Sequence, residues 1–83
     1  MKTVPHFKNE PERQQWFIEN ASFFTLIRRI NMRNERLEFP TKGEAEHAVR
    51  RLIEREPEAR YMMYAVVNEL DNFVRAFNKK NLP

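Results

Sequence analysis

The sequence predicts a small α+β domain with the element order α-β-β-α-α, in which a two-stranded antiparallel hairpin packs on helices. Three observations support this prediction. The apolar side chains of residues 62–77 recur at helical spacing, residues 22–39 contain two strand-like runs around a polar turn, and residues 41–44 fit a helix capping box. The first observation decides the fold class, because the same segment also contains strand-forming residues.

The size and composition of the chain are those of one globular domain. With 83 residues, 41% of them hydrophobic, we expect a single domain over residues 1–83, with segments 1–8 and 81–83 flexible. The chain contains no cysteine, which excludes a disulfide framework and a thiolate zinc site. The N-terminal residues carry no apolar signal region and no run approaches membrane-spanning length. We therefore expect an unexported, cytoplasmic protein without a membrane partner.

The first predicted helix covers residues 11–20. Asn9 or Glu10 can cap its start, because a side-chain oxygen there accepts a hydrogen bond from a first-turn amide. Pro11 is tolerated in the first turn, where its missing N–H group would have no helical partner in any case. The aromatic residues of this helix are then placed to pack on the core.

A β-hairpin is predicted next. Residues 22–30 are rich in Phe, Thr, Leu and Ile and are typical of a strand, whose first half is apolar on both faces. We therefore expect this strand to lie centrally or to be covered on both sides. Residues 31–34 supply a polar turn, and residues 36–39 alternate as a second strand that ends at Pro40.

The second predicted helix begins with a capping box. Thr41 can accept hydrogen bonds from first-turn amides while Glu44 reaches back to the cap. The helix is expected to end before Pro57, because the residue that precedes a proline is biased away from helical angles. Five residues at helical spacing form its apolar side: Ala45, Ala48, Val49, Leu52 and Ile53.

Residues 58–78 are predicted to form the last and longest helix. At about 100° per residue, their large apolar side chains fall within one arc of roughly 140°. The alternative order is α-β-β-α-β-β with a four-stranded antiparallel sheet, which places strands at residues 61–67 and 73–77. Two adjacent valines favour these strands, whereas Leu70 favours the helix because it would lie in the exposed turn of a hairpin. The apolar stripe consists of Met62, Met63, Val66, Val67, Leu70, Phe73, Val74 and Phe77.

The chain offers little for catalysis or metal binding. Ser22 is its only serine, and no nucleophile stands in a pattern with a base and an orienting group. Glu44 and His47 have the Glu-x-x-His spacing of helical carboxylate metal sites, but such sites need a second pair, which the chain lacks. We therefore predict a non-enzymatic protein with no catalytic residues, no metal site and no cofactor.

Basic charge is concentrated in the predicted hairpin. Residues 22–36 carry four arginines against one glutamate, while the whole chain has a net charge of +3. The planar guanidinium suits phosphate and carboxylate groups, and a two-stranded ribbon can enter a nucleic-acid groove. A solvated hairpin whose charges limit aggregation is the alternative. The candidate binding residues, for a partner protein or a phosphate, are Arg28, Arg29, Arg33 and Arg36.

The last predicted helix offers two further candidate surfaces. Its polar side can form a partner face, because Tyr and Arg are enriched in binding hot spots, although a solvated face is the alternative. Its apolar stripe is wide for a chain of 83 residues, and a homodimer through residues 62–77 would cover it. The residues of the candidate partner face are Arg60, Tyr64, Asn68 and Arg75.

The leading functional hypothesis is a small interaction module that binds another protein. The stretch of residues 39–45, Phe-Pro-Thr-Lys-Gly-Glu-Ala, resembles segments of small phage and bacterial proteins. This resemblance suggests a phage-type accessory protein, such as an inhibitor or an adaptor. The alternatives are a nucleic-acid-binding protein that uses the basic hairpin and a self-associating structural subunit.

Overall fold

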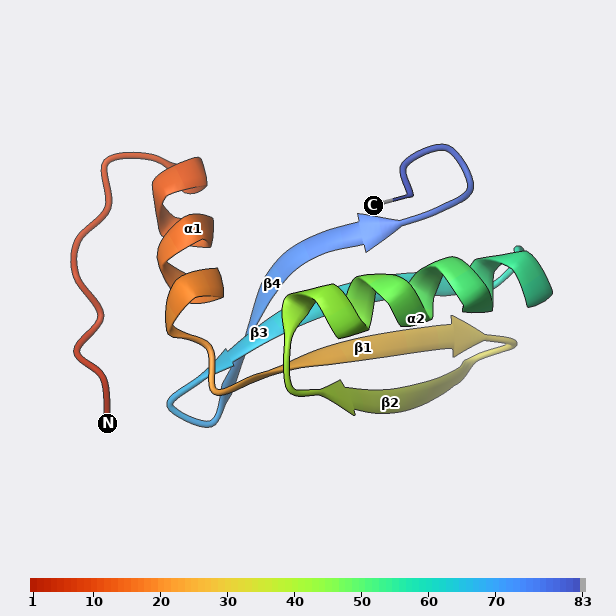
Figure 1. Ribbon diagram of the computed structural model, residues 1–83, viewed down its shortest axis with the longest axis horizontal. Helices are drawn as coiled ribbons and strands as arrows, with labels where there is room; N and C mark the ends of the chain where they lie inside the picture. The colour runs from red at the N-terminus through yellow and green to blue at the C-terminus, as the bar shows by residue number, and fades with distance from the viewer. Residues whose placement is uncertain (83) are drawn as a thin grey trace.

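The structure is a computed structural model that describes residues 1–82, and this range forms a small α+β fold with two helices and four strands (Figure 1). The element order is α-β-β-α-β-β, so the alternative prediction is confirmed and the main prediction, α-β-β-α-α, is wrong. Neither helix within this range is long and apolar enough to cross a membrane. The elements are α1 (Glu10–Asn20), β1 (Phe23–Ile30), β2 (Arg33–Phe39), α2 (Lys42–Arg55), β3 (Arg60–Val67) and β4 (Leu70–Phe77).

The strands form one antiparallel sheet in the order β2-β1-β3-β4. β1 is therefore central, which is one of the two arrangements expected from its apolar residues on both faces. β2 and β4 are edge strands, and no strand within residues 1–82 pairs with the outer side of either. α2 lies along β1 and β2, and α1 packs at the end of the sheet where β3 and β4 meet (Figure 1).

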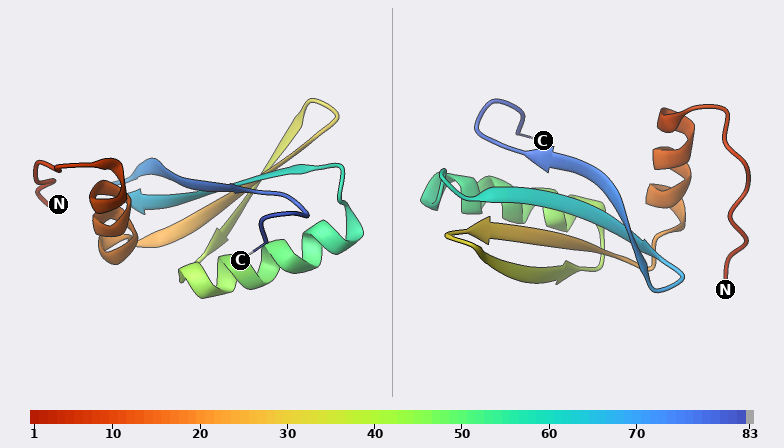
Figure 2. Two further views of the ribbon diagram at one scale, coloured as in Figure 1. Left: turned by 90° about the horizontal axis from the view of Figure 1, so that it is seen from above. Right: turned by 180° about the vertical axis from the view of Figure 1, so that it is seen from behind.

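The two faces of the sheet differ in what covers them. Both helices join one hydrophobic cluster on the same face, to which α1 contributes Phe17 and α2 contributes Val49 and Ile53. No helix of the described residues covers the other face, which we call the open face (Figure 2). By strand register, the open face consists of Phe23, Thr25, Ile27 and Arg29 of β1, Asn34, Arg36 and Glu38 of β2, Arg60, Met62, Tyr64 and Val66 of β3, and Asp71, Phe73 and Ala76 of β4.

Residues 58–78 contain a hairpin instead of the predicted helix. Asn68 (φ 53°) and Glu69 (φ 67°) form a two-residue turn, and the residues on either side of it pair as the ends of two strands. Met63 is fully buried against the helices, whereas Leu70, which favoured the helix, is 69% exposed beside the turn. Pairing of β3 with β1 and packing against the helices override the helical spacing, because strand preference depends on such tertiary contacts.

The predicted starts of the first two helices are confirmed. Asn9 Oδ1 accepts the backbone N–H of Glu12 at 2.9 Å, and Thr41 Oγ1 accepts that of Glu44 at 3.2 Å. The first hairpin is also confirmed. Its turn has only two residues, both with positive φ, so β2 begins at Arg33, earlier than predicted.

The N-terminal segment lies against the rest of the protein. Phe7 packs on the aromatic rings of α1. The backbone N–H of Lys2 donates to Asn68 Oδ1 at 2.7 Å, and Asn68 Nδ2 donates to the Lys2 carbonyl at 2.7 Å. The flexibility of both chain ends stays a prediction, and Pro83, in the predicted flexible end, lies outside the described residues.

Candidate functional site

Arg28 lies on the helix-covered face between two carboxylates. Its guanidinium donates to Glu35 Oε2 at 2.7 Å, and to Glu56 through Nε at 3.1 Å and also through Nη2. Only 17% of its side chain is exposed. The hydrogen bond to Glu56 is the main cause that raises the pKa of Arg28. Arg28 thus links β1, β2 and the end of α2, and it is not a free cation.

The Tyr61 hydroxyl is part of the same region. It lies within hydrogen-bonding distance of the carbonyl oxygens of Leu52 (3.2 Å) and Glu56 (3.1 Å). Burial, followed by the charge of Glu56, raises the pKa of Tyr61 above its ordinary value. The neutral phenol is therefore favoured in the folded state, and its contribution to stability is complete below the unfolded pKa of about 10.

We expect the free energy of unfolding to fall as the pH rises from about 10 towards the raised pKa of folded Tyr61. Urea denaturation at a series of pH values measures this loss. Tyr61→Phe should lose about 1 kcal/mol at neutral pH and show a smaller alkaline loss. Tyr64→Phe is the matched control and should keep the wild-type alkaline loss. An unchanged alkaline loss in Tyr61→Phe would contradict the assignment.

Arg36 bridges the two edges of the sheet. It donates to the carboxylate of Asp71 at 2.8 and 3.2 Å, and it lies 3.6 Å from Glu38. Because Arg36 is on β2 and Asp71 on β4, this ion pair crosses the open face over β1 and β3. Thr25, at the centre of that face, is fully buried, and its Oγ1 has no hydrogen-bond partner within residues 1–82. Side chains thus shield the middle of the open face.

The other two hairpin arginines are exposed. Arg29 points to the open face, whereas Arg33 at the start of β2 belongs to the helix-covered side. Within residues 1–82, neither forms an ion pair. The register places Arg29 directly opposite Arg60 of β3, which is also exposed. Pairing of β1 with β3 therefore brings together Arg29, a predicted binding residue of the hairpin, and Arg60, a residue of the predicted partner face.

The four residues of the predicted helix face do not form one surface, because the segment is a hairpin. Tyr64 lies on the open face beside Arg60, whereas Asn68 is in the turn and binds Lys2. The Arg75 guanidinium lies 4.5 Å from the centre of the Phe77 ring and donates to the Asn81 carbonyl at 2.5 Å.

The apolar stripe of residues 62–77 is likewise divided between the two faces of the sheet. Met63, Val67, Val74 and Phe77 belong to the buried cluster, while Met62 and Phe73 lie on the open face. A homodimer through this segment stays a prediction, and the exposed side chains of the stripe are Phe73 on the open face and Leu70 beside the turn.

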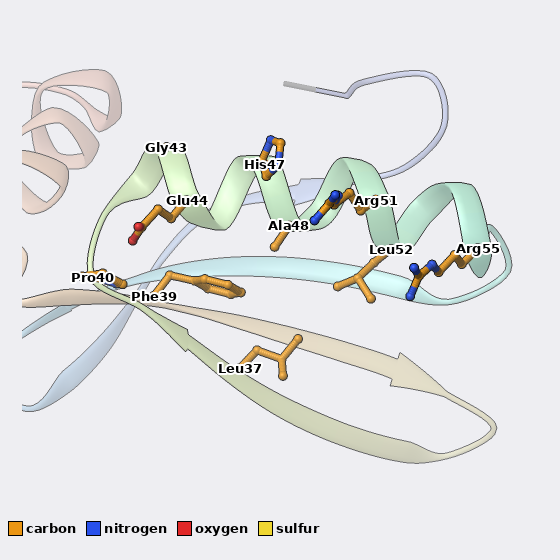
Figure 3. A pocket seen from close by; sticks show the side chains of 10 residues that line it. All are labelled: Leu37, Phe39, Pro40, Gly43, Glu44, His47, Ala48, Arg51, Leu52 and Arg55. Atoms are coloured by element: carbon orange, nitrogen blue, oxygen red, sulfur yellow. The ribbon is translucent and has the colours of Figure 1, made fainter.

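A groove lies between the edge strand β2 and helix α2 (Figure 3). It has a volume of about 710 Å³, which is in the size range of binding pockets. Its floor is apolar, with Leu37 and Phe39 from the strand and Ala48 and Leu52 from the helix. A Cβ atom on Gly43 would meet nothing within 4 Å, so the N-terminal end of the groove is open.

The rim of the groove is mainly basic. Arg51 and Arg55 stand one helical turn apart on α2, both exposed and without an ion pair among residues 1–82. Glu44 and His47 line the other end. We call this site the β2–α2 groove. It combines an apolar floor with two free guanidinium groups, which suits an apolar segment that carries acidic side chains.

The free edge of β2 borders this groove. In a two-residue hairpin the closing pair is hydrogen bonded, and hydrogen-bonded and non-hydrogen-bonded pairs then alternate along the strands. Ile30 and Arg33 are the closing pair. The backbone groups of Asn34, Arg36 and Glu38 are therefore expected to point away from β1, towards the free edge, where another strand can pair with them.

The described residues contain no cluster suited to metal chemistry. Among residues 1–82, no three His, Asp or Glu side chains lie close enough together to hold a metal ion. Glu44 and His47 both line the groove but have no further acidic or histidine neighbour there. The absence of enzymatic activity stays a prediction.

Sequence reasoning missed the groove, although it identified the residues of its floor as apolar. Ala48 and Leu52 lie on the apolar side of the second predicted helix, and Leu37 and Phe39 are the apolar residues of the second predicted strand, whose alternation points them inward. The missing information was the strand order, which makes β2 an edge strand. The small residues Gly43 and Ala48 were the available signal, because side chains of this size on α2 leave the space next to β2 unfilled.

Comparison of the chain with protein-family models, with curated proteins and with solved structures gave no match. The functional argument therefore rests on the geometry of its own residues.

Proposed function

We propose that this protein is a non-enzymatic, cytoplasmic interaction module that binds an extended segment of another protein in the β2–α2 groove. The observation that carries the proposal is the position of an apolar groove directly beside an unpaired strand edge. An inhibitor or an adaptor can bind its target through a groove of this kind. Such a protein could be a phage-type accessory protein.

The mode of binding follows from the geometry of the edge. An extended peptide can add to β2 as a fifth strand, so that main-chain hydrogen bonds give affinity and alternate side chains give specificity. Residues opposite Leu37 and Phe39 would point to the same face as these side chains. Every second residue of the peptide would therefore enter the groove beneath α2, against Ala48 and Leu52.

Charge defines the partner further. Arg51 and Arg55 line the groove without a carboxylate partner in residues 1–82. A peptide with acidic residues between or beside its apolar residues would pair with them, and Arg can do so through two parallel hydrogen bonds. We therefore expect a segment in which aliphatic side chains alternate with polar ones and at least one Asp or Glu is present.

Selection from a display library of random dodecapeptides on the immobilised protein tests this proposal. We expect the selected peptides to share apolar residues at every second position together with an acidic residue. Counter-selection on the Leu52→Glu variant, which places a carboxylate on the groove floor, should remove them. Peptides that bind both proteins equally, or that show apolar residues at helical spacing, would contradict binding as an added strand.

A further inference from the structure

The open face carries apolar and aromatic side chains although no helix covers it. Antiparallel sheets with one uncovered face usually place polar residues on it. Here Ile27, Met62, Tyr64 and Phe73 lie on the uncovered side, and Phe73 is 46% exposed. The exposed ring of Phe73 is therefore available for contact with a ligand.

The aromatic part of this face is a paired platform. Tyr64 and Phe73 are register partners on β3 and β4, with ring centroids 5.8 Å apart and ring planes at 72°. Their edge-to-face contact holds the rings in place. The exposed part of the Phe73 ring is therefore a fixed surface on which a planar group can stack.

The basic part of this face lies at its other end. Arg29 and Arg60 face each other across β1 and β3, and like charges in directly opposite positions destabilise a sheet. Within residues 1–82, no carboxylate lies within 4.0 Å of either guanidinium. Both line a hollow of about 410 Å³, with Glu58 as its one acidic residue. An anion held between the two guanidinium groups would relieve their repulsion.

The aromatic part of the face favours a single strand of nucleic acid. Arg60 and Tyr64 are four residues apart on β3, which corresponds to ~13 Å at about 3.3 Å per residue. A chain that contacts both ends therefore spans more than one nucleotide. A base that stacks on Phe73 needs a free face, as in single strands whose bases stack on aromatic side chains, whereas the bases inside a duplex stack on one another.

We propose that the open face binds single-stranded nucleic acid, with a base stacked on the Tyr64–Phe73 pair and a phosphate held between Arg29 and Arg60. A second copy of this chain fits less well, because a sheet-on-sheet dimer would bury the Arg36–Asp71 ion pair, and desolvating charges is costly. Nucleic-acid interfaces are wet and tolerate such pairs. This binding site is independent of the β2–α2 groove.

Fluorescence anisotropy with labelled ten-nucleotide oligouridylate and oligothymidylate, and with a ten-base-pair DNA duplex, tests the proposal. We expect binding of single strands at about 50 mM salt, weaker binding of the duplex, and affinity that falls with rising salt. Phe73→Ala should weaken single-strand binding by about 5- to 150-fold, the effect of losing one stacked base. Arg60→Gln should reduce the salt slope by about 0.7, the value for one phosphate contact on a single strand.

A control variant distinguishes binding at the open face from binding at α2. Arg50→Gln changes an exposed arginine on α2 and should leave affinity unchanged. Circular dichroism establishes that each variant is folded. Failure of both oligonucleotides to bind, or binding that is unaffected by Phe73→Ala and Arg60→Gln, would overturn the proposal. Analytical sedimentation tests whether a second copy binds there instead. A dimer that the Phe73→Ala substitution dissociates, in a protein that binds no oligonucleotide, would assign the open face to a second copy.

Discussion

Met63→Ala is expected to lower the free energy of unfolding by about 2–5 kcal/mol, the usual cost of truncating a large core side chain to alanine. Met63 is fully buried at the centre of β3, where it pairs with Leu26 of β1 and faces the helices. Domains of this size have a total stability of roughly 5–15 kcal/mol. The variant should therefore unfold at a much lower urea concentration than the wild type, or fail to fold at 25 °C.

Met62→Ala is the matched control for this substitution. Met62 precedes Met63 in the chain but points to the open face and is only partly buried. We expect a loss of about 1 kcal/mol or less, which is in the range of surface substitutions. Equal, large losses in the two variants would contradict the strand assignment, because the two side chains lie on one buried side only if residues 58–78 form a helix.

Leu52→Glu is expected to abolish binding of any peptide selected on the β2–α2 groove, with a loss of at least about 30-fold, equivalent to about 2 kcal/mol, as for a binding hot spot. The new carboxylate would stand on the apolar floor beside Leu37 and Phe39, where an unpaired charge is costly. Isothermal titration calorimetry with a synthetic selected peptide measures the change.

Leu52 also packs on the core, so a second variant is needed to separate loss of binding from loss of folding. Arg51→Glu combined with Arg55→Glu changes only exposed groove residues. It should weaken the acidic peptide by roughly tenfold, since each exposed ion pair contributes up to about 1 kcal/mol. A peptide with Lys in place of its acidic residues should recover affinity for this variant. Unaltered binding of the original peptide would show that the rim does not contact it.

The fold could be predicted from the sequence up to residue 56. Asn9 and Thr41 carry capping signals in their own side chains, and both caps are present. The apolar residues on the two faces of β1 indicated either a central strand or one covered on both sides, and the strand is central. These signals are local, so they do not depend on what the rest of the chain packs against.

The last third of the chain could not be assigned from periodicity, because its apolar residues come in adjacent pairs. Pairs at residues 62–63, 66–67 and 73–74 fit one side of a helix, and they equally fit strands that carry apolar side chains on both faces. The turn between the strands gave a weak signal, since Asn68 tolerates positive φ but Glu69 lacks the freedom of the glycine that such turns prefer.

The candidate sites depended on this assignment. Tyr64 and Phe73 become neighbours only when β3 pairs with β4, and Arg29 meets Arg60 only when β1 pairs with β3. The β2–α2 groove exists because β2 is an edge strand. Residue types alone indicated a basic hairpin and apolar segments, but pairing between distant strands determines which of them share a surface.

Amide hydrogen exchange of β2 with and without a selected peptide tests most directly whether the protein binds its partner by strand addition. The amides expected at the free edge are those of Asn34, Arg36 and Glu38. Strong protection of these three amides on binding, with the β4 edge unchanged, is the predicted result. If the protein is saturated with peptide and these three amides stay unprotected, or the amides of β4 are protected instead, the proposed mode of binding is contradicted.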